Sequence, residues 1–251
     1  MKIEWIIEDK DVTRIIEVLD DNKNEFTRAR KKHNVDKENV VIDKDSVLWS
    51  MLICLLTSQQ RSGPETVIGK FFQLENFLVT YNSMKNETNK ETFIRNILVK
   101  NNLTRYINRI SSFFDYNVRY FDENAWIILE ELQWLNEHEG KQNERHLADK
   151  LDDDLQGFGP KQSRNFLQSL GLTKYEIPID SRIIRWLQEF GFPIPLSSSA
   201  LGDKKYYHFV LDRIQDLCQH SGVYPCMLDA AIFSSYDEGK WNEFNVRAGT
   251  F

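Results

Sequence analysis

A lysine and an aspartate, nineteen positions apart, are the residues of this 251-residue chain best placed to do chemistry. Lys161 follows the turn Gly157-Phe158-Gly159-Pro160, in the first turn of a predicted helix. There the helix macrodipole disfavours the protonated amine, and burial would lower the pKa of the amine further. A neutral lysine amine is a nucleophile. The alternative is an exposed lysine that merely tolerates its position.

Asp180 ends the run Ile177-Pro178-Ile179 and precedes an amphipathic pattern. Pro178 opposes a helix just before it, so we expect Asp180 to be the N-cap of the next helix. An N-cap needs no chemistry to explain it. The two roles are compatible if the second carboxylate oxygen faces a cleft.

The turn before Lys161 joins two predicted helices and is suited to binding an anion. Gly157 and Gly159 permit unusual backbone conformations and leave N–H groups uncovered, while Pro160 fits the first turn of the following helix. Exposed amides at a helix N-terminus attract phosphate, and a DNA phosphate is the anion expected here. On the glycines alone, a plain corner between helices would be the better reading.

Together these segments resemble a known family. Gly157-Phe158-Gly159-Pro160-Lys161 followed by Ile177-Pro178-Ile179-Asp180 resembles the helix-hairpin-helix and Gly-Pro-Asp signature of base-excision DNA glycosylases. The resemblance implies that Lys161 is the nucleophile and Asp180 the essential aspartate. It also implies that Gly157, Gly159 and Arg164 belong to the DNA-binding hairpin.

Two further segments extend the resemblance. Leu55-Leu56-Thr57-Ser58-Gln59-Gln60 is similar to a family segment whose polar side chain fills the gap left by an extruded base, a role that falls on Gln59, with Gln60. Many members have His two positions after the aspartate, where this chain has Arg182. We expect Arg182 to hold a phosphate instead.

The resemblance also points to a branch of the family. Three cysteines cannot supply the four thiolates of an iron–sulfur cluster, so the endonuclease III branch does not fit. Pro225 to Phe233 resembles the last helix of archaeal-type 8-oxoguanine enzymes, which lines the base pocket. We therefore expect base contacts from Asp229 and Phe233, with Trp49, although Asp229 could be another helix cap.

The implied function is a bifunctional DNA glycosylase/AP lyase that excises an oxidised base through a lysine Schiff base and β-elimination. Among oxidised bases, 8-oxoguanine is the favoured substrate. The alternatives are a glycosylase for oxidised pyrimidines, a non-catalytic helix-hairpin-helix DNA-binding protein, and a helical interaction protein. The expected partner is damaged double-stranded DNA bound by a monomer. No cofactor is expected, no metal site is assigned, and a monovalent cation at the hairpin is the one ion considered.

The elements that must position these residues are helical. Apolar residues recur at three- and four-residue steps in most segments, which predicts an all-α protein, with Val40-Val41-Ile42 the one strand-like run. We expect a helical bundle over residues 45–155. A second helical subdomain would comprise 1–44 plus 156–251, include the helix-hairpin-helix at 155–170, and face the first across a cleft.

Charge and hydropathy limit the alternatives. The net charge of −6 argues against nucleic-acid binding, but between Leu155 and Phe190 five basic residues face three acidic ones, a local charge of +2. The basic run Arg28 to Lys32 is best read as a solvated helix face, with a phosphate contact as the alternative. No apolar run approaches the ~20 residues that span a bilayer, and Met1 to Trp5 lacks signal-peptide features. We expect a cytoplasmic (nucleoid) or nuclear protein.

Overall fold

The computed structural model describes residues 5–74, 78–237 and 240–246, without the side chains of 244 and 245. Residues 1–4 and 247–251, the two ends of the predicted second subdomain, lie outside that range. The described part of the chain is helical and contains no strand, as predicted. The strand-like run Val40–Ile42 is a loop: Val41 is exposed, while Val40 and Ile42 pack on the core. Residues 5–74, 78–237 and 240–246 include no strand that could pair with this run.

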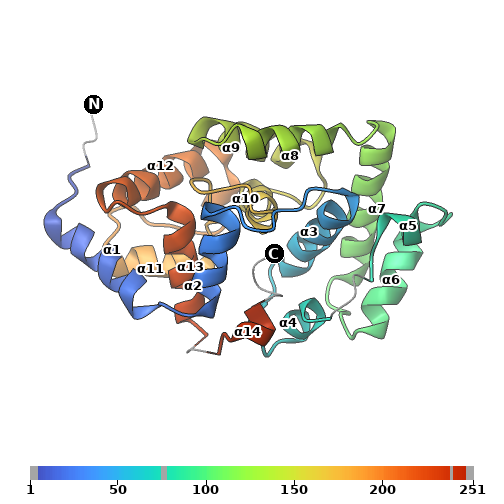
Figure 1. The fold of residues 1–251 in the computed structure, drawn as a ribbon, viewed down its shortest axis with the longest axis horizontal. Helices are drawn as coiled ribbons and strands as arrows, with labels where there is room; N and C mark the ends of the chain where they lie inside the picture. Colours follow the sequence, from blue (N-terminus) through green and yellow to red (C-terminus); the bar gives the residue numbers. More distant parts are fainter. Residues whose placement is uncertain (1–4, 75–77, 238–239, 247–251) are drawn as a thin grey trace.

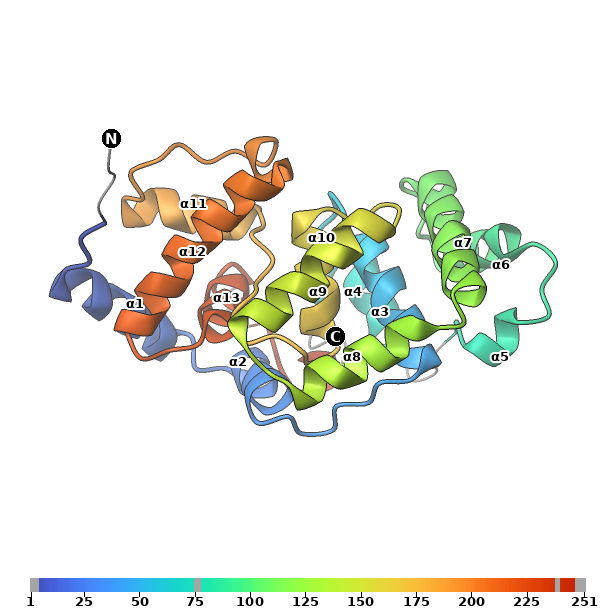
Figure 2. The same cartoon turned by 90° about the horizontal axis from the view of Figure 1, so that it is seen from above.

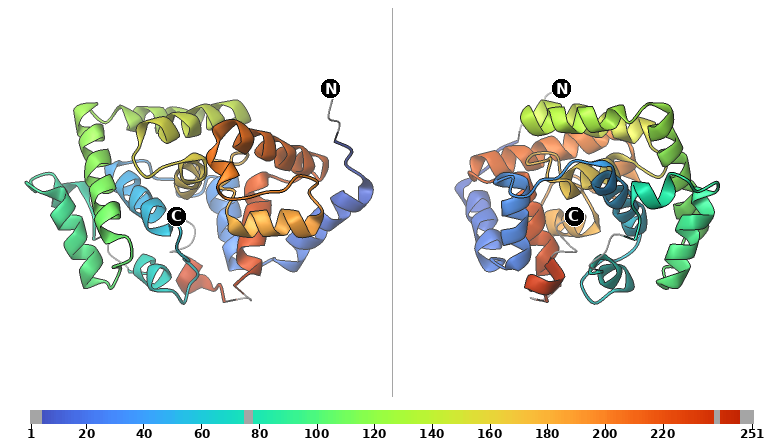
Figure 3. Two further views of the ribbon diagram at one scale, coloured as in Figure 1. Left: turned by 180° about the vertical axis from the view of Figure 1, so that it is seen from behind. Right: turned by 45° about the vertical axis from the view of Figure 1, so that its right-hand side comes forward.

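The helices form two groups, with a central helix between them (Figures 1 and 2). One group comprises α1 (Asp9–Asp21), α2 (Glu25–Arg30), α11 (Ser181–Phe190), α12 (Lys204–His220) and α13 (Pro225–Ser235). The other comprises α3 (Lys44–Thr57), α4 (Val67–Phe72), α5 (Tyr81–Met84), α6 (Lys90–Lys100) and α7 (Ile107–Glu123). The views from behind and turned by 45° show α8 (Ile127–Glu137) and α9 (Lys141–Asp154) lying along one side of α10 (Pro160–Ser169) (Figure 3). Short elements complete the order: η1 (Lys31–Val35), η2 (Ala200–Gly202) and α14 (Glu243–Val246).

Two hydrophobic cores correspond to these groups. The first core is built mainly from α3 to α9, and the second from α1 and α11 to α13. The central helix α10 places Phe166, Leu167 and Leu170 in the first core, although the sequence suggested that it belongs to the second subdomain. The chain boundaries at 45 and 155 stay a prediction. The position of α10 means that whatever it carries lies between the two cores.

Local signals in the sequence explain several helix ends. α3 begins after Asp43, whose side chain accepts from the Ser46 amide in a capping box. Ser46 fills the reciprocal position, because its hydroxyl accepts from the Asp43 amide. Pro160 occupies the first turn of α10, as predicted, and Gly171 lies just beyond the end of that helix at φ +76°.

Throughout the residues described, no helix combines the length and apolar character needed to cross a membrane.

Candidate active site

The turn between α9 and α10 requires glycine at its first glycine position. Gly157 has φ +80°, and a Cβ there would lie 2.4 Å from the Phe113 ring and 2.7 Å from a Leu55 methyl group. Asn117 fixes the preceding residue, because its side chain accepts from the Gln156 amide at 2.8 Å and donates to the Gln156 carbonyl at 3.0 Å. Close packing and a positive φ together exclude larger residues at 157.

Gly159 serves the turn differently. Its backbone is extended, with φ −148°, and a Cβ there would meet nothing within 4 Å. The glycine therefore leaves open the space in front of the first turn of α10. Gly157 and Gly159 both line a groove of about 1310 Å³.

A pocket of about 90 Å³ adjoins this groove, and Lys161 and Asp180 line both. The predicted nucleophile and its acidic partner therefore occur together. Lys161 is half-buried, and its amine forms no hydrogen bond or ion pair with any residue described. Burial lowers the pKa of Lys161, with a smaller contribution from the nearby Arg182 cation, while Asp180 opposes the shift. A larger fraction of this amine is therefore neutral than for an exposed lysine.

Asp180 is the N-cap of α11, as predicted, and it also lines the pocket; its catalytic role stays a prediction. Its Oδ1 accepts from the amides of Arg182 at 2.8 Å and Ile183 at 3.1 Å, which makes it the N-cap of α11. Its Oδ2 lies 3.4 Å from the Arg182 guanidinium. The cap fixes the carboxylate at the pocket, where its second oxygen accepts from Arg182.

One face of α10 supplies part of the polar pocket wall. Lys161, Asn165 and Gln168, at positions i, i+4 and i+7, all line the pocket. Gln168 is 2% exposed; its amide donates to Asp229 Oδ2 at 2.8 Å, while its Oε1 has no partner. We did not single out Gln168 from the sequence, although its helical spacing from Lys161 was a usable signal.

Asp229 and Phe233 line the pocket, as the resemblance implied. Burial raises the pKa of Asp229 to about 6, with the Arg30 cation opposing the shift. The Phe26 and Phe233 rings stack at 4.9 Å between centroids, and Trp241 lies 4.7 Å from Phe26. The pocket thus combines aromatic faces with a buried carboxyl and a buried amide.

The raised pKa gives Asp229 a measurable effect on stability. Because its folded pKa of about 6 lies above the ordinary 3.8, the stability that protonation provides is complete below about pH 4 and is lost as the pH rises to about 6. We expect the melting temperature of Asp229→Asn, minus that of the unsubstituted protein, to rise by a few degrees as the pH is raised from 4 to 7. Thermal unfolding across this range tests it, and a pH-independent difference between the two proteins would contradict it.

The basic run Arg28 to Lys32 is only partly the solvated face that we expected. Arg28, Lys31 and Lys32 are exposed, but Arg30 is 6% exposed and lines the pocket. The helix α2 packs against α13, and this turns Arg30 inward. Sequence periodicity over so short a helix did not reveal it.

The groove gathers positive charge despite the acidic composition. Gln59, Gln60 and Arg182, the predicted DNA contacts, line it, and Gln60 and Arg182 also line the pocket; their contact with DNA stays a prediction. Gln59 is exposed and has φ +61°, directly after the end of α3. The basic residues that line the groove are Lys161, Arg61, Arg105, Arg109, Arg182 and Arg185, against the acidic Asp180 and Asp237.

Two predicted site residues are wrong. Arg164 is fully buried and paired with Glu176 and Asp149, so it cannot reach DNA. Trp49 is 4% exposed and does not line the pocket; it packs against Phe71 and lies behind Phe72, which does. Both errors have one cause, because local sequence does not show which face of a helix meets a distant element.

Comparison with known proteins finds a relative by sequence and a similar solved structure. No family model matches the chain. The chain is 26% identical over 121 residues, or 48% of its length, to the 8-oxoguanine DNA glycosylase/AP lyase of Thermoplasma volcanium, and spans only 54% of that relative. Its structure resembles that of the 8-oxoguanine DNA glycosylase of Thermotoga maritima, with a TM-score of 0.61 and 16% identity, covering 94% of this chain and 99% of the other. At that identity the likeness shows the fold.

Proposed function

We propose that this chain belongs to the superfamily of 8-oxoguanine-type DNA glycosylases and that it is a bifunctional DNA glycosylase/AP lyase acting on an oxidised purine in duplex DNA; its fold and its sequence likeness support the proposal. The observation that carries the proposal is the occurrence of Lys161 and Asp180 in one pocket beside a groove rich in arginine. A half-buried amine without a partner suits nucleophilic attack better than it suits structural support.

The proposed reaction begins with extrusion of the target base into the pocket, at a cost of a few kcal/mol. The neutral amine of Lys161 then attacks the anomeric carbon C1′, and the bond from C1′ to the base breaks. Asp180 accepts a proton from the amine and offsets the positive charge that develops on the sugar. The departing base takes up a proton.

The second stage cuts the strand. The sugar ring opens to leave an imine between Lys161 and C1′, loss of a C2′ proton follows, and the 3′ phosphate departs by β-elimination. Water then hydrolyses the imine and frees the amine. These steps use side-chain groups alone; a monovalent cation at the hairpin stays a prediction. Among the residues described, no group of three or more His, Cys, Asp or Glu is arranged to hold a metal ion.

The pocket favours a purine lesion over a pyrimidine one in our proposal. Phe26, Phe233 and Trp241 offer an extended aromatic surface for a bicyclic base, while Gln168 and Asp229 offer polar groups for its edge. On the DNA side we propose that Gln59 and Gln60 fill the gap in the duplex. Arg182 and the hairpin amides would hold phosphates.

A cleavage panel tests the function. Duplexes carrying 8-oxoguanine, thymine glycol, uracil or adenine in a mismatch are incubated with the protein, and strand cleavage and borohydride-trapped adducts are measured. We expect more strand cleavage and a higher adduct yield on the 8-oxoguanine duplex than on the other three. Activity on thymine glycol alone would favour the oxidised-pyrimidine alternative, and salt-sensitive binding with no cleavage on any duplex would favour a non-catalytic DNA-binding protein.

A further inference from the structure

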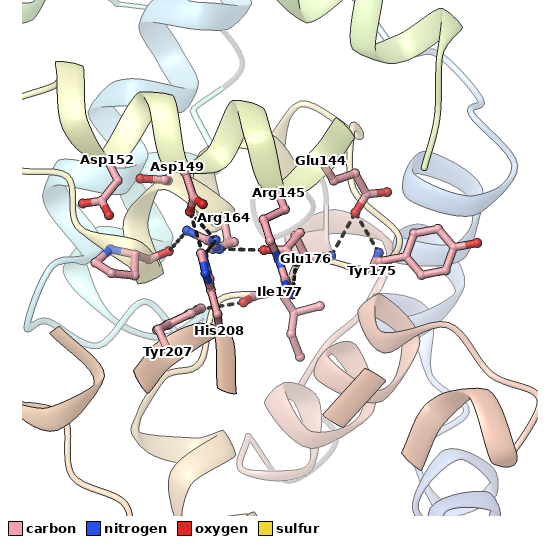
Figure 4. A network of polar contacts seen from close by, with 12 residues as sticks. Glu144, Arg145, Asp149, Asp152, Arg164, Tyr175, Glu176, Ile177, Tyr207 and His208 are labelled. Atoms are coloured by element: carbon pink, nitrogen blue, oxygen red, sulfur yellow. Dashed lines mark hydrogen bonds and ion pairs between the residues drawn. The ribbon is translucent and has the colours of Figure 1, made fainter. Parts of the chain in front are cut away.

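Arg164 lies three residues after Lys161 in α10, and its side chain is fully buried (Figure 4). Its Nε donates to Glu176 Oε2 at 2.9 Å, and its Nη2 donates to Asp149 Oδ1 at 2.8 Å. Its Nη1 lies 3.3 Å from the Pro160 carbonyl, in the first turn of the same helix. One side chain therefore joins the helix that carries Lys161 to α9 and to the segment after α10.

That segment, residues 173–179, leads directly to Asp180 and is held by side chains along its length. The Glu144 carboxylate accepts three consecutive backbone N–H groups, at 2.9, 2.8 and 2.8 Å. The Tyr207 hydroxyl accepts from the Ile179 amide at 2.7 Å and donates to the Ile177 carbonyl at 2.8 Å. The segment is therefore fixed at both ends relative to α9 and α12.

Glu176, in the middle of this segment, has no exposed side-chain surface and lies between two arginines (Figure 4). Besides Arg164 it accepts from Arg145 Nε at 2.9 Å, and Arg145 also pairs with Asp212 of α12 at 2.8 Å. Buried ion pairs often contribute little net stability, because desolvation offsets the attraction. A role beyond stability would account for such a network beside the pocket.

We propose that Arg164 is a positioning residue, which sets the separation of the Lys161 amine and the Asp180 carboxylate by fixing α10 to segment 173–179. The inference rests on the proposed function. The Lys161 amine forms no hydrogen bond with any residue that the structure describes, so its place relative to Asp180 depends on the helix that carries it. Arg164 follows Lys161 by three residues and Glu176 precedes Asp180 by four, so their ion pair is a short connection between the two site residues.

The experiment separates positioning from stability by replacing the ion pair with apolar residues. The double variant Arg164→Met with Glu176→Leu removes both charges, an exchange that is often neutral or stabilising for buried pairs. The control is Lys150→Met, which removes the ion pair of α9 with Glu131 at 2.5 Å but leaves α10 and the segment connected. Each protein is examined by thermal unfolding, single-turnover excision and the pH dependence of that rate.

We expect the double variant to fold with a melting temperature within a few degrees of the unsubstituted protein, while its excision rate falls about 10- to 100-fold. Its acid limb should also move to higher pH, because a displaced Lys161 leaves the buried position that lowers its pKa. The charged and titratable groups around that amine are Asp180, Cys54, Arg182 and Asp229, and none of them is substituted. Lys150→Met should retain both the rate and the acid limb.

The outcomes separate this inference from the proposed function. If the unsubstituted protein forms no borohydride adduct with any lesion, the proposed function itself fails. If it does, and the folded double variant keeps both the rate and the acid limb, Arg164 does not position the site. Where the double variant does not fold, Glu176→Gln keeps the volume of the side chain and weakens the pair. A wild-type rate and acid limb in that variant overturn the inference equally.

Discussion

The Lys161→Gln variant is expected to form no borohydride-trapped adduct and to lose at least about 10³-fold in excision rate. Glutamine keeps a polar side chain, one bond shorter than that of lysine, but supplies no amine to attack C1′. Because Lys161 has no hydrogen bond or ion pair within the described chain, its replacement should change the melting temperature little. The measurement is denaturing electrophoresis of the protein with labelled 8-oxoguanine duplex and borohydride.

The matched control is Lys205→Gln. Lys205 occupies the second position of α12, as Lys161 does in α10, but it is exposed and does not line the pocket or the groove. The Lys205→Gln variant should form the borohydride-trapped adduct and cleave the duplex as the unsubstituted protein does. An adduct of undiminished yield in Lys161→Gln would mean that another amine is the nucleophile, and our assignment would be wrong.

Asp180→Asn is expected to lower the excision rate by about 10²-fold or more while leaving the fold intact. Asparagine caps helices about as well as aspartate, so the hydrogen bonds to the Arg182 and Ile183 amides can persist. The lost feature is the negative charge beside the amine. Single-turnover excision and thermal unfolding, measured on the same preparation, separate the two effects.

Asp203→Asn provides the comparison for that experiment. Asp203 caps α12 by accepting from the Tyr206 amide at 2.8 Å, and it does not line the pocket or the groove. Asp203→Asn, like Asp180→Asn, replaces a capping carboxylate by an amide, and it should leave the excision rate unaltered. If Asp180→Asn excises at a rate within threefold of the unsubstituted protein, Asp180 has no role beyond its cap.

The sequence predicted those features of the site that depend on local chemistry. The glycine turn, Pro160 at the start of α10 and Asp180 at the start of α11 each follow from what a short stretch of backbone requires. The sequence could also have predicted that Gln168 lies on the same face of α10 as Lys161, since it follows Lys161 by two helical turns. These features depend on neighbours within about seven residues.

Features that depend on distant partners could not be predicted in this way. We predicted Arg164 to be a DNA contact because it follows the hairpin, but α9 and segment 173–179 bury its side chain. The acidic run before the hairpin is a related case: Asp152 and Asp153 pair with Lys204 of α12, and Asp154 accepts from the Tyr120 hydroxyl. No motif marks those partners. Lys204 follows Asp152 by some fifty residues, and Tyr120 precedes Asp154 by more than thirty.

The placement of α10 has a consequence for how the molecule comes apart. Its apolar side is embedded in one core through Phe166 and Leu167, and on its other side Arg164 stacks over the ring of Tyr207, which belongs to the other core. Neither core can melt without withdrawing support from this shared helix. Denaturation should therefore be a single cooperative event, and the backbone amides of α10 should be among the last to exchange with deuterium.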